Sequence, residues 1–283
     1  MFRWQNVIVS ICLCIVTGAA SAALSDGLIS AWTFDDGTAN DSFGNNDGAL
    51  MGGAEIVDAN HAGFGNAVNL NGTDAFVEIP HSDSMNAMAD GLTAACWFFV
   101  RGNTQEFPSF FWKGLQVGWS PGFLFQISFR HSGTAIIHFG SCTDSVEGWF
   151  NTNEGAVDDG QWHHVATTAD GKELNAYFDG EQRIELQSSF TGGNAPLPLA
   201  GPYNVFPDQP IRIGMSQGLG GNAFNDPGPL ERRAFIDGMI DEAVIYSRAL
   251  SPEEIKQLMS ASIGTGVDPK AKLAAIWANL KTY

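Results

Sequence analysis

The chain has 283 residues, with 31 Asp and Glu against 14 Lys and Arg, and a formal net charge of −17 at pH 7. Such an acidic surface repels nucleic acid and anionic membranes, so both are excluded as partners, whereas divalent cations and neutral glycans are compatible with it. The same acidity is also typical of an exported protein that is merely kept soluble by its charge, and that interpretation stays open.

The first 22 residues have the pattern of a secretory signal peptide. Arg3 gives a positive start, the apolar run VIVSICLCIVTGA follows, and the small residues ASA stand at the cleavage spacing. The run is shorter than the roughly 20 apolar residues that cross a bilayer, and no later stretch is apolar enough to span one. We therefore expect residues 1–22 to be removed, leaving a protein without membrane insertion that is secreted or held at the cell surface.

Residues 23–262 are filled by short apolar or alternating runs, separated by Gly, Asn and Asp. Such runs are typical of short strands joined by turns. The clearest are residues 28–34, 75–80, 92–100, 122–130 and 134–140. Helical periodicity is absent until the end of the chain. We therefore predict one all-β domain, a two-sheet antiparallel β-sandwich of the jelly-roll class, with a short C-terminal helical segment.

Cys96 and Cys142 are the cysteines that remain after the predicted signal is removed. An even number of cysteines in an oxidising compartment favours a disulfide, so we predict a bond between these two. Two separate buried thiols, packing as small hydrophobic side chains, are the alternative. The sequence does not show how near the two Cα atoms lie.

A repeated pattern of strand and Asp-Gly turn fills residues 160–180, GQWHHVATTADGKELNAYFDG. Two strands that each end in an Asp-Gly turn, with a third run after them, predict a meander. Side chains alternate along a strand, so His164 shares a face with Trp162, whereas His163 points to the other face. The two histidines therefore cannot bind one metal ion together, and we expect both to be structural.

Residues 235–259, FIDGMIDEAVIYSRALSPEEIKQLM, predict a strand followed by a helix. Ser251 at the N-cap, Pro252 at the first helical position and Glu254 three residues after the cap form a capping box with a proline start. Residues 263–283 are predicted to be a linker and a second helical stretch with an apolar stripe. This tail packs on its own domain, frays, or docks on a partner, and the sequence leaves those alternatives open.

Five motifs occur in a recognisable order: AWTFDDGTANDSFGNNDGAL, AVNLNGTDAFVEIP, GQWHHVATTADGKELNAYFDG, IRIG and GMIDEAVIYSRALSPEEI. Together they resemble the LamG-like jelly-roll domain of the concanavalin A-like lectin/glucanase superfamily, from about Gly27 to Met259. Two loops, residues 191–210 and 216–233, are longer than the family pattern. The resemblance implies a sandwich of two curved antiparallel sheets and, for most members, binding or adhesion, although a fold alone does not fix function.

The resemblance also implies a structural calcium ion, because relatives hold one with oxygen ligands from an early strand, a Gly carbonyl and a late Asp. Carried over to this sequence, the ligands are Asp35, the backbone carbonyl of Gly72 and Asp241. Asp41 and Asp47 are substitutes if the register differs. The alternative is that Asp35 caps a turn and Asp241 accepts backbone hydrogen bonds.

Glucan-cleaving relatives with this fold carry alternating carboxylates, Glu-x-Asp-x-(x)-Glu, on one strand that lines a cleft. The only acidic pair on a plausible strand here is Asp241-Glu242, and Met239 stands where the first acid would be. Motifs for other nucleophiles, metalloproteases and phosphate binding are missing as well. We therefore predict no catalytic residue.

Three tryptophans in or beside loops are candidates for stacking against sugar rings: Trp112, Trp119 and Trp149. The alternative is that these large side chains lie in the core. Together these observations predict an exported, non-catalytic module that binds carbohydrate or a cell-surface or matrix protein, with a calcium ion in a supporting role. A structural or adhesion protein without a small ligand and a divergent glycan hydrolase are the alternatives.

Overall fold

The fold is known from a computed structural model, which describes residues 24–61, 64–102, 106–114, 123–131, 135–143, 147–155, 157, 159–183, 197–217 and 233–261. In chain order the elements are β1 (Leu28–Trp32), β2 (Ala49–Met51), β3 (Glu55–Asp58), β4 (Asn66–Asn71), β5 (Phe76–Ile79), the 3-10 helix η1 (Asp83–Ala89), β6 (Leu92–Val100), β7 (Glu106–Gly114), β8 (Phe123–His131), β9 (Ala135–Cys142), β10 (Glu147–Gly155), β11 (Trp162–Ala169), β12 (Glu173–Phe178), β13 (Glu181–Gln182), β14 (Leu197–Pro198), β15 (Ile211–Ile213), β16 (Met215–Gln217), β17 (Arg233–Phe235), β18 (Asp237–Tyr246) and α1 (Pro252–Ala261). The predicted signal peptide and the tail 263–283 lie outside these residues, so both stay predictions.

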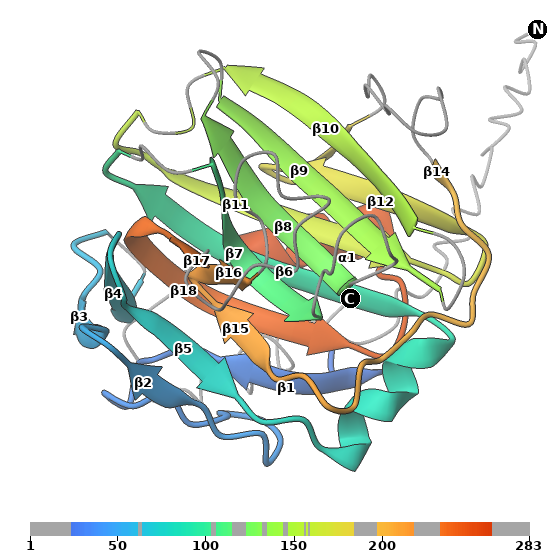
Figure 1. Cartoon of the computed structure of the whole chain (residues 1–283), viewed down its shortest axis with the longest axis horizontal. Coiled ribbons are helices and arrows are strands. Elements are labelled where there is room, and N and C mark those ends of the chain that lie inside the picture. The colour runs from blue at the N-terminus through green and yellow to red at the C-terminus, as the bar shows by residue number, and fades with distance from the viewer. Residues whose placement is uncertain are drawn as a thin grey trace, which may run out of the picture.

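Two large antiparallel sheets form the sandwich. In one, a nine-stranded sheet, the order is β13-β12-β11-β6-β18-β4-β3, with β1 paired to β18 and β14 to β12. In the other, a seven-stranded sheet, the order is β10-β9-β8-β7-β15-β5-β2. Figure 1 shows the seven-stranded sheet nearer the viewer and the nine-stranded sheet behind it. The predicted β-sandwich with a short C-terminal helix is confirmed.

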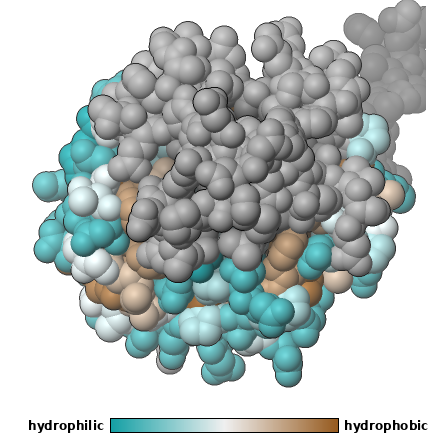
Figure 2. Space-filling view, viewed as in Figure 1, coloured by the Kyte–Doolittle hydropathy of each residue, from teal (hydrophilic) through white to brown (hydrophobic). Residues whose placement is uncertain are grey.

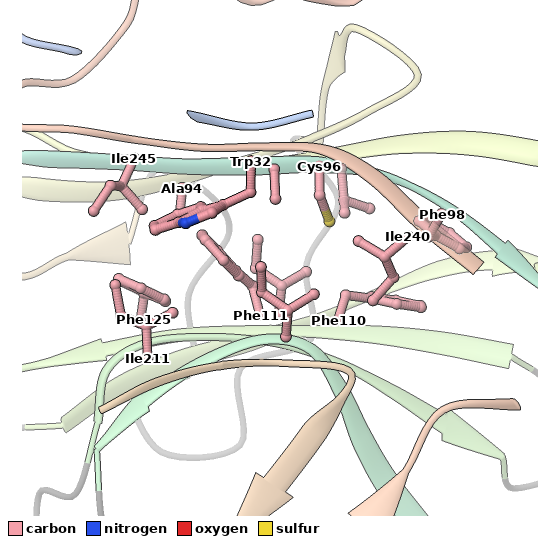
Figure 3. Close-up of a cluster of buried hydrophobic side chains, with 14 of the residues drawn as sticks. Trp32, Ala94, Cys96, Phe98, Phe110, Phe111, Phe125, Ile211, Ile240 and Ile245 are labelled. Atoms are coloured by element: carbon pink, nitrogen blue, oxygen red, sulfur yellow. The ribbon is translucent and has the colours of Figure 1, made fainter. Parts of the chain in front are cut away.

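The core lies between the two sheets, and apolar side chains reach into it from both. Figure 3 shows Trp32, Cys96 and Phe98 from the nine-stranded sheet facing Phe110 and Phe111 from the seven-stranded sheet. Two aromatic pairs join the layers, Trp32 edge-on to Phe111 at 6.2 Å between ring centroids and Phe98 stacked on Phe110 at 4.0 Å. Burial of these apolar surfaces is the main force that holds the sheets together.

The predicted disulfide between Cys96 and Cys142 is not present in the structure. No disulfide joins them, and both side chains are fully buried. Cys96 lies in β6 of the nine-stranded sheet, whereas Cys142 ends β9 of the seven-stranded sheet. Because burial also raises the pKa of the Cys96 thiol, that side chain is a neutral core residue.

The predicted capping box at the start of α1 is confirmed. Ser251 Oγ accepts the backbone N–H of Glu254 at 3.2 Å, and Glu254 Oε2 accepts the backbone N–H of Ser251 at 2.8 Å. Glu254 also holds the guanidinium of Arg248 in a bidentate pair at 2.9 and 2.7 Å. From this anchored start the helix packs Ile255 against Tyr246 on the outer face of the nine-stranded sheet.

The two adjacent histidines lie on opposite faces of β11, as the alternation predicts. His164 is almost fully buried, with its ring edge-on to Trp97 at 5.4 Å between centroids. Burial lowers the pKa of His164 to about 4, so the imidazole is neutral at pH 7. His163 contacts the ring of Phe178 and bonds to Asp179 through Nδ1 at 2.9 Å. The pair therefore forms no shared metal site.

Candidate functional site

The three candidate calcium ligands do not meet at one point. Gly72 follows β4 and lies beside Asp237, at the start of β18, with its N–H bonded to the carbonyl of Ile236 at 2.9 Å. Asp241 lies four residues further along β18, and Asp35 contacts the opposite end of β4. The six residues of β4 span roughly 20 Å at about 3.3 Å per residue. The carbonyl of Gly72 is therefore remote from both carboxylates.

Asp241 accepts a backbone hydrogen bond, as the alternative interpretation has it, whereas Asp35 bonds to a residue 31 positions away. Asp35 Oδ1 accepts the N–H of Asn66 at 3.0 Å, and the fully buried Asp241 accepts the N–H of Glu242 at 2.7 Å. Within the described ranges no three His, Cys, Asp or Glu side chains are grouped as a metal centre requires. The calcium ion stays a prediction, with Asp35 and Asp241 as candidate ligands near the same end of β4.

The substitute ligands Asp41 and Asp47 organise the loop between β1 and β2. The Asp41 carboxylate accepts four backbone N–H groups at 2.9–3.0 Å, those of Ala31, Phe43, Gly44 and Asn46. Asp47 in turn accepts the N–H of Asp41 at 3.0 Å. Asp41 is thus surrounded by donors, whereas a cation needs oxygen acceptors around it.

A row of polar side chains and one indole crosses the seven-stranded sheet on its outer face. The strand register pairs Glu78 with Arg212, Arg212 with Trp112, and Trp112 with Gln126. Their neighbours along each strand belong to the core between the sheets: Val77, Ile79, Ile211, Ile213, Phe111, Phe125 and Ile127. Because side chains alternate along a strand, these four residues, here called the polar row, face away from the core.

The polar row is closely packed and almost inaccessible. Arg212 Nε lies 3.5 Å from Glu78 Oε2, and Trp112 Nε1 donates to the carbonyl of Gly114 at 2.9 Å. Gln126 Nε2 donates to the hydroxyl of Ser128 at 2.7 Å. Gln126 is 1% exposed and Arg212 is 7% exposed. The row therefore presents a guanidinium, a carboxylate, an amide and an indole in one buried layer outside the core.

The Ser128 hydroxyl continues this layer into the next row of the sheet. It lies 2.7 Å from the hydroxyl of Ser109, its register partner on β7. Both serines are fully buried. Two hydroxyls and an amide are thus linked in one hydrogen-bonded group, whose donors and acceptors match those that hydroxyl-rich molecules use.

Lys113 follows Trp112 on β7 and pairs with Ile211 of the core, so it lies on the other face of the strand from the polar row. The Lys113 ammonium donates to the carbonyls of Phe206 and Gln209 at 3.2 and 2.5 Å. Burial, followed by the charge of Arg212, lowers the pKa of Lys113 to about 8. This lysine secures the loop ahead of β15, which carries Arg212.

The hairpin of β16 and β17 borders the polar row. It contacts β7, and its Met215 and Phe235 pack with Phe76 on the outer face. Figure 2 views this side of the molecule, where hydrophilic surface along the described edge surrounds a few hydrophobic areas. The hairpin therefore gives the row an apolar border.

The tryptophans predicted to stack on sugars have three different outcomes. Trp112 lies inside β7 and is fully buried, which disagrees with an exposed platform, although it belongs to the outer face and not to the core. Trp149 pairs with Gly140, which pairs with Gln126, so the register puts it in line with the polar row. Trp119 lies outside the described residues.

Sequence reasoning missed Arg212, Gln126 and Glu78. The signal was present, since each is a polar residue within a short apolar strand, in IRIG, FLFQISF and FVEI. An isolated polar residue at an outward position of such a strand identifies the outer face, but its burial depends on what covers the sheet.

Helices in the described part of the chain are all too short or too polar to cross a membrane.

A family model described as the concanavalin A-like lectin/glucanases superfamily matches residues 71–256. A search of curated protein sequences found no significant match.

Several solved structures share the fold. Domain 4 of AbnA, an extracellular arabinanase from Geobacillus stearothermophilus solved with arabinotriose, is 20% identical with a TM-score of 0.52, over 82% of this chain and 98% of its own. The binding domain of Paraclostridial Mosquitocidal Protein 1 is 18% identical with a TM-score of 0.55, over 82% of this chain and 52% of its own. The binding domain of botulinum neurotoxin DC, solved with rat synaptotagmin II, is 14% identical with a TM-score of 0.55, over 83% and 52%. The chain thus spans about half of each toxin domain, and identities this low show the fold alone.

Proposed function

Because this chain belongs to the concanavalin A-like lectin/glucanases superfamily, we propose that it is an exported, non-catalytic module that binds carbohydrate. The binding surface lies over the outer face of the seven-stranded sheet, above the buried polar row that includes Arg212, Trp112 and Gln126. Export uses residues 1–22, and the signal-like sequence of this segment supports it. A calcium ion held by Asp35 and Asp241 stabilises the domain.

The observation that carries the proposal is the polar row itself. Buried polar groups cost free energy unless they are hydrogen-bonded, and apolar side chains of similar volume are often as stable. The core does not use these groups, since they face away from it. A guanidinium and an amide are groups that form hydrogen bonds with sugar hydroxyls. Binding therefore explains residues that packing does not require.

Two ligand complexes among the similar solved structures support a carbohydrate ligand. AbnA domain 4 is described with arabinotriose, and a binding domain of botulinum neurotoxin DC is described with SialylT. A protein partner is the second candidate, because another structure of the same toxin domain is described with synaptotagmin II. Carbohydrate is preferred because the polar row offers several donors and acceptors close together.

The absence of catalysis is proposed from the one acidic pair. Glycosidases need two carboxyl groups facing one cleft, about 5–9.5 Å apart. Asp241 is fully buried, whereas the half-buried Glu242 follows it at an irregular point of β18 with a φ of 49°. Release of soluble sugar from any bound glycan would contradict this part of the proposal and favour a divergent hydrolase.

The test is a glycan array probed with the exported protein and two variants. Gln126→Leu removes the amide from the polar row and leaves Ser128 paired with Ser109, so we expect an unchanged melting temperature and at least about tenfold weaker binding, which is about 1.4 kcal/mol. Thr167→Val, the control, removes a buried hydroxyl from the nine-stranded sheet and should bind normally.

Three results of the glycan array bear on carbohydrate recognition, on the polar row and on the calcium ion. A wild type that binds no glycan contradicts carbohydrate recognition and leaves a protein partner. Equal binding by wild type and Gln126→Leu removes the polar row from the site. Binding that is lost on chelation and restored by calcium supports the ion, whereas binding and melting that both ignore chelation remove it.

A further inference from the structure

The outer face of the nine-stranded sheet carries a band of half-buried apolar side chains beside the end of α1. The register aligns Met239 with Phe99 and Phe99 with Trp162 across three neighbouring strands. All three side chains are half-buried, and together they are called the aromatic band here. The nearest part of α1 is Met259, which packs against the same cluster close to the end of the helix. The band therefore adjoins the end of α1.

Trp162 is held firmly within this band. Its indole stacks on Phe64 at 5.1 Å between centroids with an interplanar angle of 18°, and Phe99 lies 5.9 Å away. Phe64 is fixed in turn by edge-on contacts with His61 at 4.7 Å and with Trp97 at 5.1 Å. A ring that is already immobilised loses little entropy when a ligand stacks on it.

The turn after β3, which carries His61 and Phe64, includes one residue in the left-handed region of the backbone. Asn60 has a φ of 55°, in the left-handed region that few side chains other than Asn tolerate. The Asp58 carboxylate accepts the N–H of Asn60 at 2.7 Å, and the N–H of Phe64 bonds to the carbonyl of His61 at 3.1 Å.

Planar polar groups line one side of the band. Asn69, which pairs with Met239, donates to Glu55 Oε1 at 3.0 Å and accepts from Arg101 Nη1 at 2.9 Å. Arg101 is anchored by Asp237, also at 2.9 Å. A flat apolar strip with a hydrogen-bonding side suits a ligand that has an apolar face and hydroxyl groups around it.

Two buried side chains in the neighbouring row of the nine-stranded sheet have polar atoms without a hydrogen-bond partner among the described residues. Trp97 Nε1 and His164 Nδ1 are buried, with no hydrogen-bond partner in the described part of the chain. Trp97 is 7% exposed and His164 is 1% exposed. Buried polar groups are nearly always paired, so each calls for a partner such as a bridging water or a ligand hydroxyl.

The size and charge of the surface select among ligand classes. A protein interface needs about 800 Å² on each partner, whereas three half-buried side chains match the size of one or two rings. The net charge of −17 disfavours anionic ligands. A neutral sugar satisfies both conditions, because its ring has an apolar face and its hydroxyls are uncharged.

We propose that the aromatic band is a second carbohydrate-binding surface, in which a neutral sugar ring stacks on Trp162 and its hydroxyls meet Asn69. This inference rests on the proposed function but uses a different face of the molecule. The two surfaces lie on opposite outer faces of the sandwich, so one molecule bridges two glycan chains.

The experiment is affinity electrophoresis of the exported protein through gels that contain arabinan, xylan, β-glucan or mannan. Trp162→Ala is expected to weaken the retardation of the wild type about tenfold, and Trp162→Phe, which keeps a ring on Phe64, to restore most of it. Phe99→Ser tests the band at a second position. Phe43→Ala is the control, because Phe43 is an exposed aromatic residue outside the band.

The outcomes separate this inference from the proposed function. Equal retardation of wild type, Trp162→Ala and Phe99→Ser overturns the aromatic band and leaves the polar row standing. A wild type that no polysaccharide retards overturns both. Loss in Trp162→Ala and Phe99→Ser, with Trp162→Phe and Phe43→Ala close to wild type and all melting curves cooperative, supports the band. Loss in Phe43→Ala as well indicates a general surface effect and overturns it.

Discussion

Replacement of Asp41 by Ala should cost more stability than any other change in the loop between β1 and β2. The substitution removes the acceptor of four backbone N–H groups at once. Three of these hydrogen bonds are partly buried, and the fourth, from Phe43, is exposed. Water can replace the carboxylate at the exposed N–H but only incompletely at the others.

The magnitude follows from that count. A hydrogen bond to a charged group contributes about 1.5–3 kcal/mol, and bonds that share one acceptor are not additive. We therefore expect Asp41→Ala to lower the free energy of unfolding by about 3–5 kcal/mol, or the melting temperature by roughly 10 °C. Asp41→Asn keeps one oxygen and should cost about 1–2 kcal/mol. Asp47→Ala loses a single exposed bond and should cost less than about 1 kcal/mol.

The assay is urea and thermal denaturation of the three variants, each with and without EDTA. A loss below about 1 kcal/mol for Asp41→Ala would refute the anchoring role. A wild type that EDTA destabilises as much as the mutation does, together with a variant that ignores EDTA, would show instead that Asp41 binds a cation.

Three further predictions concern pH, thiols and the metal. Burial opposes charging of His163, yet the hydrogen bond and charge of Asp179 raise its pKa above the ordinary value. Protonated His163 therefore stabilises the fold fully below pH 6.5, and this stabilisation is lost as pH rises through the pKa of His163 in the folded protein. Asp179→Asn should therefore lower the free energy of unfolding more at pH 5 than at pH 8. Equal losses at the two pH values would contradict this. Thiol titration of the denatured, unreduced mature protein should find two thiols, those of Cys96 and Cys142. A count of no thiols would show that the disulfide is present. Asp241→Ala should remove any effect of chelator on the melting temperature, and an undiminished effect would exclude this residue as a ligand.

Local rules predicted the parts of the fold that depend on neighbours in sequence. Ser251 and Glu254 are three residues apart, and their reciprocal hydrogen bonds need only one helical turn. His163 and His164 fall on opposite faces because any strand alternates. Such features do not depend on how the sheets are assembled, so the sequence alone was sufficient for them.

Features that depend on distant register were not predictable. Gly72 and Asp241 were assigned to one calcium site, but β18 pairs Asp237 with Asn71 and carries Asp241 further along the strand. A register across about 170 residues is determined by the whole sheet. Trp112 is predicted in or beside a loop, and its place on the outer face emerges only from pairing with Arg212.

The position of β18 determines when this chain can fold. In the nine-stranded sheet β18 lies between β6 and β4, and β1 also pairs with it. Until residues 237–246 have been made, the β3–β4 pair has no strand that joins it to β6, β11 and β12. Long-range pairing of this kind is slow, because distant segments must meet before any contact is formed. If the chain is exported as proposed, it therefore stays unfolded until nearly all of it has passed through the secretion channel. A chain truncated before Asp237 should yield separate, aggregation-prone fragments of sheet.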